Sequence, residues 1–157
     1  MPRTDAPSIR LTTLLVAGIV LGSGAAACTS APDEALTPAA YRTAVTAVCT
    51  STSNARDQLT EPNEAGAVAA FASSVAKLLN DEAESIRVIR PPDELDDDHR
   101  AFVQNTADQA KRWTILATTP PTDAATFGSL TGEIAALSFG RDDLAAQMQL
   151  TACQRTS

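Results

Sequence analysis

Apolar residues recur every three or four positions from residue 41 to residue 148, in four stretches separated by proline-containing segments. This spacing puts them on one face of an α-helix, whereas a strand requires alternation of apolar and polar residues, which no segment shows convincingly. The pattern therefore predicts four amphipathic helices. Their apolar stripes are, in chain order, Tyr41, Val45, Val48, Thr52, Ala55 and Leu59; Val68, Phe71, Val75, Leu78, Leu79, Ile86 and Ile89; Leu95, Phe102, Thr106, Ala110, Trp113 and Leu116; and Phe127, Leu130, Ile134, Leu137, Leu144 and Met148.

Capping residues and prolines set the expected helix ends. Thr37 and Pro38 supply an N-cap and a first helical residue. The second helix ends at residues 90–92, Arg-Pro-Pro, because proline cannot continue the hydrogen-bond ladder. Thr122 is expected to cap the fourth helix. Gly140 is unfavourable inside a helix, which leaves a kink or split in the fourth helix as an open alternative.

Four amphipathic helices joined by short connections predict an all-α fold, an antiparallel up-down-up-down four-helix bundle over residues 37–157. The first and fourth helices are neighbours in that topology. Aromatic residues make up only 4% of the chain, which favours thin, closely packed helices over a sheet sandwich. Gly128 and Gly132, four residues apart, would allow close approach of a neighbouring helix, although this signal is weak in a soluble helix.

The N-terminal region follows a different pattern. Arg3 and Arg10 precede an apolar run at residues 11–21, and small residues at 22–27 lead to Cys28. This is the layout of a bacterial export signal. The run is short for a membrane span, which needs about 20 apolar residues, and glycines interrupt it.

Three alanines, residues 25–27, directly precede Cys28 and resemble a lipobox, the cleavage site of bacterial lipoprotein signal peptides. The resemblance implies that residues 1–27 are removed and that Cys28 becomes the acylated first residue. Residues 28–36 would then be a tether, and the protein would be lipid-anchored on the extracytoplasmic face of the cell membrane. The lipobox family usually carries leucine where this chain has Ala25, so soluble secretion and an uncleaved anchor are the alternatives.

The cysteine count bears on this choice. If Cys28 is lipidated, Cys49 and Cys153 remain as an even pair, whereas simple secretion leaves an odd thiol in an oxidising compartment. We therefore expect a lipoprotein with a Cys49–Cys153 disulfide that ties the end of the fourth helix to the first. The closed loop of about 105 residues corresponds to roughly 4–5 kcal/mol of chain entropy. Because Cys49 lies in mid-helix, the fourth helix has to end opposite it.

Beyond the leader, the chain resembles small alanine- and threonine-rich lipoproteins of high-GC Gram-positive bacteria. The resemblance is carried by residues 41–49, by residues 91–95 followed by His99, and by the late Cys153. Proteins of this kind generally lack a defined activity, so the resemblance implies no catalytic residue.

The net charge of the chain limits the classes of partner that we expect. Without residues 1–27, the chain holds 10 basic and 18 acidic residues, a net charge of −8. No basic patch or basic helix is present, so neither nucleic acid nor an anionic lipid surface is an expected partner. Attachment to the membrane has to come from the acyl chains on Cys28.

No arrangement of residues indicates catalysis, a metal or a cofactor. His99 is the only histidine, and no Gly-x-Ser-x-Gly elbow, zinc motif or phosphate-binding loop accompanies it. We interpret His99 as a hydrogen-bonded residue near a helix start. His99 and Met148 could ligate haem across one end of the bundle, but no Cys-x-x-Cys-His motif is present and core packing explains Met148.

The densest charge run, residues 93–98, contains five carboxylates and no glycine for a calcium loop. Consecutive residues on a helix point about 100° apart, so these carboxylates cannot converge on one ion. The helix dipole favours acidic residues in a first turn, and we interpret the run as a solvated helix start. A weak metal site or a site for a cationic partner is the alternative.

Two functions stay open. The first is a non-catalytic interaction or structural module that presents an acidic helical surface to an envelope protein. The second is a carrier for a lipid or other apolar ligand. Small side chains such as Thr52 and Ala55 could leave room for the ligand or could equally let the helices pack tightly, and the sequence does not separate these alternatives. A ligand cavity would be lined by four apolar residues, Phe71, Phe102, Trp113 and Ile134. We favour the interaction module.

Overall fold

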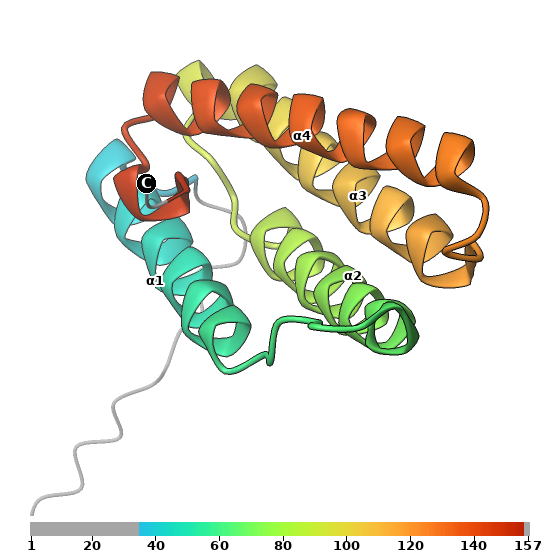
Figure 1. Ribbon diagram of the computed structural model, residues 1–157. Helices are drawn as coiled ribbons and strands as arrows, with labels where there is room; N and C mark the ends of the chain where they lie inside the picture. Colours follow the sequence, from blue (N-terminus) through green and yellow to red (C-terminus); the bar gives the residue numbers. More distant parts are fainter. Residues whose placement is uncertain (1–34, 156–157) are drawn as a thin grey trace, which may run out of the picture. The chain divides into compact units, whose positions relative to one another are not determined.

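The computed structural model describes residues 35–155, and every regular element in this range is helical. The α-helices and short 3-10 turns are, in order, α1 (Pro38–Asp57), α2 (Ala65–Arg87), η1 (Asp93–Leu95), α3 (Asp96–Thr118), α4 (Ala124–Gln147) and η2 (Thr151–Cys153) (Figure 1). The all-α prediction is confirmed. The predicted signal peptide, Cys28 and most of the predicted tether lie outside the described residues.

Successive helices run in opposite directions, and α3 packs against both α2 and α4 (Figure 1). The antiparallel four-helix bundle is thus confirmed. One detail differs from the expectation, because α1 packs against α2 and η2 and does not run beside α4 along its length. Contact between α1 and α4 is made at the last turns of α4, where Ala145 and Met148 join Tyr41 and Val45 in one buried cluster.

The helix ends follow local chemistry. The Thr37 side chain accepts a hydrogen bond from the Ala40 backbone N–H at 3.3 Å, and Pro38 is the first residue of α1, as predicted. The cap of α4 is Asp123, which accepts from the Thr126 N–H at 3.1 Å, so the prediction of Thr122 was wrong by one residue. A carboxylate at this position is favoured by the positive end of the helix dipole.

The core consists of three clusters of stripe residues. The largest surrounds the disulfide and holds fully buried Tyr41, Val45, Ile86 and Phe102. The other two lie between α2, α3 and α4 and contain, among others, Val75, Leu79, Leu116, Leu130 and Ile134. Alanines are buried at the helix contacts, which lets the helices pack closely.

α4 runs without interruption through Gly140, so the structure does not show the split that the sequence left open. A Cβ atom at Gly140 would come within 3.3 Å of the Asn105 side chain on α3. Glycine at this position therefore serves close packing between α3 and α4. α4 also departs from the predicted amphipathic pattern, because its exposed side carries Gly132, Ala135 and Phe139, the last 62% exposed.

The end of α4 reverses the chain. Gln149 adopts a left-handed conformation, with φ of 61°. The Leu150 N–H donates to the Ala145 carbonyl at 2.7 Å, and the Gln149 N–H donates to the Ala146 carbonyl at 3.0 Å. This is the Schellman arrangement, in which glycine usually occupies the left-handed position. The turn buries Leu150 completely and leads η2 back toward α1.

Replacing Gln149 by glycine removes the steric cost of the left-handed backbone, which exceeds the extra entropy that glycine loses on folding. We expect Gln149→Gly to raise the free energy of unfolding by roughly 0.5–1 kcal/mol in chemical denaturation. The matched control is Gln147→Gly in the last turn of α4, where glycine only weakens the helix. Equal destabilisation by both changes would contradict the strain at residue 149.

Candidate functional site

A disulfide joins the C-terminal turn to the middle of α1. Cys49 and Cys153 are bonded across a sequence separation of 104, with their Cα atoms 5.1 Å apart, which confirms the predicted pairing. The sequence suggested that Cys153 lies at the end of the fourth helix, but the structure places it in η2. The reversal at Gln149 carries it back to a position opposite Cys49, which the end of α4 alone does not reach. Both cysteines are buried.

A buried ion pair lies beside the disulfide. Arg141 Nη2 of α4 is 2.6 Å from Glu82 Oε1 of α2, and the Glu82 side chain is fully shielded from solvent. The Arg141 guanidinium also lies over the Phe102 ring, 5.2 Å from its centroid, and Nη2 is 4.0 Å from Cys49 Sγ. α1, α2, α3 and α4 therefore all contribute to the surroundings of this one guanidinium.

The electrostatics of Glu82 are set first by burial. Removal from water raises the pKa of Glu82, and the charges of Arg141 and Arg56 partly oppose this increase. Within residues 35–155, the buried atoms Glu82 Oε2 and Arg141 Nε have no hydrogen-bond partner. The pair is thus incompletely satisfied, and its attraction has to offset the desolvation of two charges.

Glu82 and Arg141 were not recognised as interior residues from the sequence. The apolar stripe predicted for the second helix does not include Glu82, yet this residue is buried. A signal was present, because the buried residues Val75, Leu79, Glu82 and Ile86 follow one another at intervals of four, three and four positions. Arg141 lies seven positions after the buried Ile134, which is about two helical turns further along the same face of α4. Opposite charges at stripe positions of two helices indicate a buried pair.

Two hollows flank the contact between α1 and α2. One, of about 370 Å³, is bounded by the disulfide, Thr52, Glu82 and Arg141. The other, of about 440 Å³, is lined by Thr52 and Ala55 of α1 together with residues of α2 that include Asp81, Glu82 and Ser85. The small side chains Thr52 and Ala55 therefore border open space beside α1, and charged and hydroxyl groups line much of that space.

A second polar contact is buried at the opposite end of α1. The Tyr41 hydroxyl is 3.0 Å from His99 Nδ1 and 3.8 Å from Met148 Sδ, so Tyr41 occupies the position between these two residues. Burial lowers the pKa of His99, while burial and the charge of Asp98 raise the pKa of Tyr41 to about 12. The prediction of a hydrogen-bonded histidine near a helix start is confirmed, and the residue is only 5% exposed.

Of the four residues expected to line an apolar ligand cavity, Phe71 and Ile134 are linked through Trp113, whereas Phe102 lies in a separate cluster. Phe102 is fully buried in the cluster around the disulfide, whereas Ile134 packs with Leu116 and Leu130 in a different cluster. Phe71 and Trp113 contact each other edge to face, with ring centroids 6.1 Å apart. None of the four residues lines the hollows described here. They contribute to packing.

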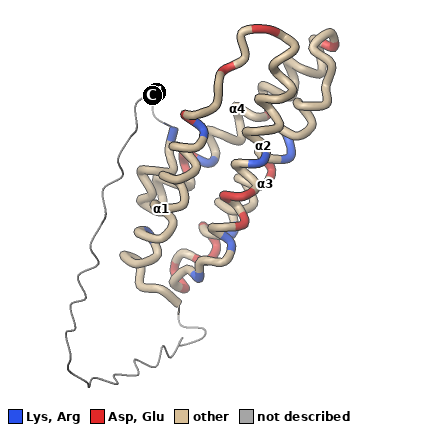
Figure 2. Tube along the Cα trace, turned by 90° about the horizontal axis from the view of Figure 1, so that it is seen from below, with Lys and Arg blue, Asp and Glu red and all other residues tan. Residues whose placement is uncertain are grey.

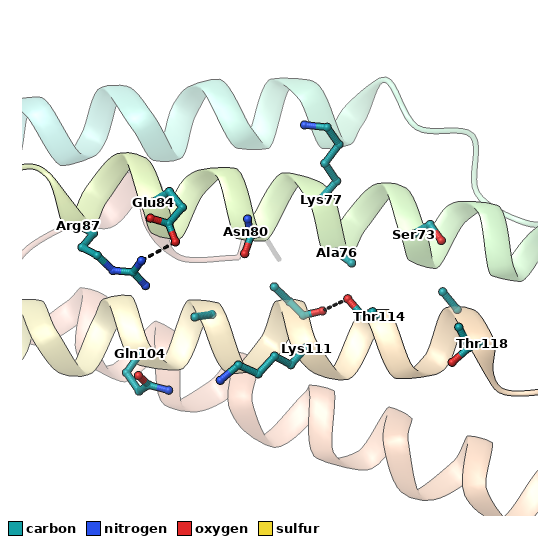
Figure 3. Close-up of a pocket in the computed structure, with 13 residues that line it drawn as sticks. Ser73, Ala76, Lys77, Asn80, Glu84, Arg87, Gln104, Lys111, Thr114 and Thr118 are labelled. Carbon is teal, nitrogen blue, oxygen red and sulfur yellow. Dashed lines mark hydrogen bonds and ion pairs between the residues drawn. The ribbon is translucent and has the colours of Figure 1, made fainter.

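An open groove of about 590 Å³ lies between α2 and α3 (Figure 3). Its walls are mainly small or polar residues, including Ser73, Ala76 and Asn80, and Figure 3 shows Arg87 at one end held by Glu84. Lys77 and Lys111 on its rim form ion pairs with carboxylates of their own helices. The groove therefore offers neither unpaired charge nor a large apolar surface.

The acidic run at residues 93–98 covers η1 and the first turn of α3. Asp97 is 95% exposed at its side chain, which confirms the solvated helix start. Arg100 forms ion pairs with Asp96, at 3.1 Å, and with Asp97. Across residues 35–155 there is no group of three or more His, Cys, Asp or Glu side chains arranged to hold a metal ion.

Comparisons with known proteins found no matching family model, no matching curated protein and no matching solved structure. Within the described part of the chain, no helix is both long enough and apolar enough to cross a membrane. The predicted lipidation site, Cys28, lies outside that part. The function of this chain therefore has to be inferred from its own residues.

The buried ion pair gives a direct stability test. Arg141→Met leaves the Glu82 carboxylate buried without a counter-charge, and we expect it to lower the free energy of unfolding by about 3 kcal/mol. The double variant Glu82→Met with Arg141→Met removes both desolvated charges and should recover most of that loss. Chemical denaturation compares four proteins: the unsubstituted chain, Arg141→Met, Glu82→Met and the double variant. A double variant as unstable as the sum of both single variants would contradict the coupling.

The burial of His99 predicts that the stability of the fold depends on pH. Because the pKa of folded His99 lies below its ordinary value of 6.5, the unfolded chain binds more protons as the pH falls through 6.5. The stability contributed by neutral His99 is therefore present above pH 6.5 and is lost as the pH falls toward the folded pKa. His99→Asn, which cannot titrate, should show a weaker loss in thermal unfolding over this range. Parallel curves would show that His99 is not responsible.

Proposed function

We propose that this protein is a lipoprotein, held on the extracytoplasmic face of the cell membrane by acyl chains on Cys28, and that it acts there as a non-catalytic interaction module. The observation that carries the proposal is the Cys49–Cys153 disulfide. Structural disulfides persist in oxidising compartments. With two of the three cysteines bonded to each other, Cys28 is the one left for lipidation, directly after the alanines that resemble a lipobox.

The surface chemistry supports a protein partner over nucleic acid or lipid headgroups. Acidic and basic residues are interspersed along α2 and α3 (Figure 2). Lys77, Arg87, Arg100 and Lys111 each form an ion pair with a carboxylate three or four residues away on the same helix, so these cations are already neutralised locally. Residues 28–157 carry a net charge of −8, so an anionic lipid surface does not attract them. Attachment through acyl chains does not depend on this charge.

The interior polar groups support a non-catalytic role. The single histidine is buried against Tyr41, and the buried carboxylate of Glu82 is bound to Arg141. Ser138 donates to the Gln109 side chain across α3 and α4 at 3.2 Å. A general acid or base has to reach a substrate, and each of these groups is instead engaged in holding helices together.

Replacing the anchor residue tests the proposal. In a bacterium that lipidates exported proteins, Cys28→Ala should move the protein from the membrane fraction to the soluble extracytoplasmic fraction, because two acyl chains give stable attachment and none remain. Incorporation of a palmitate analogue should be lost at the same time. Ser30→Ala, two residues further along, is the matched control and should stay lipidated and membrane-bound.

Two results would contradict the proposal. Membrane attachment that survives Cys28→Ala would rule out the lipid anchor. Recovery of the anchored protein from intact cells only as an uncrosslinked monomer, after treatment with a general amine-reactive crosslinker, would rule out the interaction role.

A further inference from the structure

The hollow of about 370 Å³ beside the disulfide, which we call the disulfide hollow, is lined by charges of both signs. Three arginines and three carboxylates contribute to it, namely Arg56, Asp57, Glu61, Glu82, Arg141 and Arg155. Positive and negative charges are thus equal in number here, whereas residues 28–157 together carry a net charge of −8. A lining of this kind favours a ligand that is neutral overall and carries one charge of each sign.

Arg56 is the arginine of the disulfide hollow that the fold leaves available. Arg141 and Arg155 form ion pairs, at 2.6 Å and 2.7 Å, with carboxylates of the same chain. Arg56 is exposed in the last turn of α1 and, among residues 35–155, its guanidinium has neither an ion pair nor a hydrogen bond. Burial raises the pKa of Glu82 and the charge of Arg56 partly opposes this increase, so the two groups are close enough to interact. Arg56 can therefore bind the carboxylate of a ligand in the hollow.

Glu82 supplies the opposite charge on the inner side of the hollow. Its side chain is fully shielded from solvent, and its Oε1 atom is held by Arg141. Among residues 35–155, the second carboxylate oxygen, Oε2, has no hydrogen-bond partner. A buried charged oxygen without a donor carries a desolvation cost, which a bound donor offsets. An ammonium group combines N–H donors with a positive charge, so it is the ligand group that this oxygen favours.

Access to Oε2 involves two half-buried side chains. Thr52 of α1 and Leu78 of α2 line the disulfide hollow and also the neighbouring hollow of about 440 Å³, as Glu82 does, so these three residues separate the two hollows. Side-chain rotamers commonly change at a binding site while the backbone moves little. We therefore expect rotation of Thr52 and Leu78 to open Oε2 to a ligand without a change in helix packing.

The rest of the wall is largely apolar. Val75 and Leu79 of α2 line the hollow as buried residues, together with the Cys49–Cys153 disulfide. This surface fits an aliphatic side chain, which gains free energy on leaving water. Apolar walls with a few polar groups that fix orientation are typical of small-molecule sites, whose usual volume is about 300–1,000 Å³. The disulfide hollow has both properties.

We propose that the disulfide hollow binds a small zwitterion with an aliphatic side chain, an α-amino acid or a dipeptide, whose carboxylate lies at Arg56 and whose ammonium group lies at Glu82 Oε2. The inference goes beyond the proposed function, since it adds a small-molecule ligand to the interaction module. It does not depend on the lipid anchor, because every group that contacts the ligand lies within residues 35–155.

An NMR titration tests the proposal on the full chain carrying Cys28→Ala, with the disulfide formed. The probes are leucine and leucyl-leucine, and we expect at least one of them to shift the amide resonances of residues 52–56 and 78–82 in a saturable way. N-acetylation removes the ammonium charge of that probe, and amidation removes its carboxylate charge. Each change should weaken binding at least about tenfold, because each removes a charged hydrogen bond. Glycylglycine, which has both charges and no aliphatic side chain, should bind more weakly than leucyl-leucine.

Two conservative substitutions assign the charges. Arg56→Gln should weaken the unmodified probe at least about tenfold and should leave the affinity of the amidated probe unchanged, because that probe has already lost the carboxylate. Glu82→Gln should have the same effect on the unmodified probe and none on the N-acetylated probe. Arg87→Gln, an arginine of α2 outside the hollow, is the matched control and should not change binding. Thermal unfolding checks that the variants are folded, and the exposed Arg56 keeps the test decisive if Glu82→Gln unfolds the chain.

The proposal is overturned if neither probe shifts the resonances of residues that line the hollow, or if the affinity survives Arg56→Gln. Equal affinities of the unmodified, acetylated and amidated probes would also overturn it, because the site would then recognise neither charge. Such a failure leaves the proposed lipoprotein and its interaction role standing, since membrane fractionation and crosslinking test those separately.

Discussion

The covalent link between Cys49 and Cys153 holds the C-terminal turn against the middle of α1, and the surrounding core depends on this position. A loop of this length is stabilised by roughly 4–5 kcal/mol through the restricted unfolded chain, which is a large share of the stability of a small domain. α1 packs mainly against α2 and η2, so the link replaces the helix–helix contact that a closed bundle would provide. Its geometry requires the reversal at Gln149, since the end of α4 lies beside Tyr41 and the chain has to turn back to bring Cys153 opposite Cys49.

Buried polar contacts and small side chains have different roles in the interior. Arg141 contacts Glu82, Phe102 and the Cys49 sulfur at the junction of the four helices, and Tyr41 joins His99 and Met148 at the other end of α1. These polar contacts specify which helices meet, whereas buried alanines let them approach.

Features that depend on neighbouring residues in sequence could be predicted, and features that depend on distant residues could not. The spacing of apolar residues predicted that Tyr41 and Phe102 lie in the core. The side chain of Thr37, directly before Pro38, predicted the N-cap of α1. The burial of Glu82 was not predicted, because a charged residue is normally exposed. Its position follows the spacing of the buried stripe, and Arg141 of α4 supplies the opposite charge. The position of Cys153 was missed because Gln149 takes a left-handed conformation that glycine normally signals. The lipid anchor at Cys28 remains a prediction from the sequence.

We propose that the chain is exported and lipidated at Cys28, with the Cys49–Cys153 disulfide holding its C-terminal turn against α1. The most direct test is mass spectrometry of the protein extracted from bacterial membranes, digested without reduction. We predict an N-terminal peptide that begins at Cys28 and carries acyl chains, together with a disulfide-linked pair of peptides containing Cys49 and Cys153. An unmodified Cys28 within an uncleaved N-terminal peptide, with free thiols at Cys49 and Cys153, would contradict the claim.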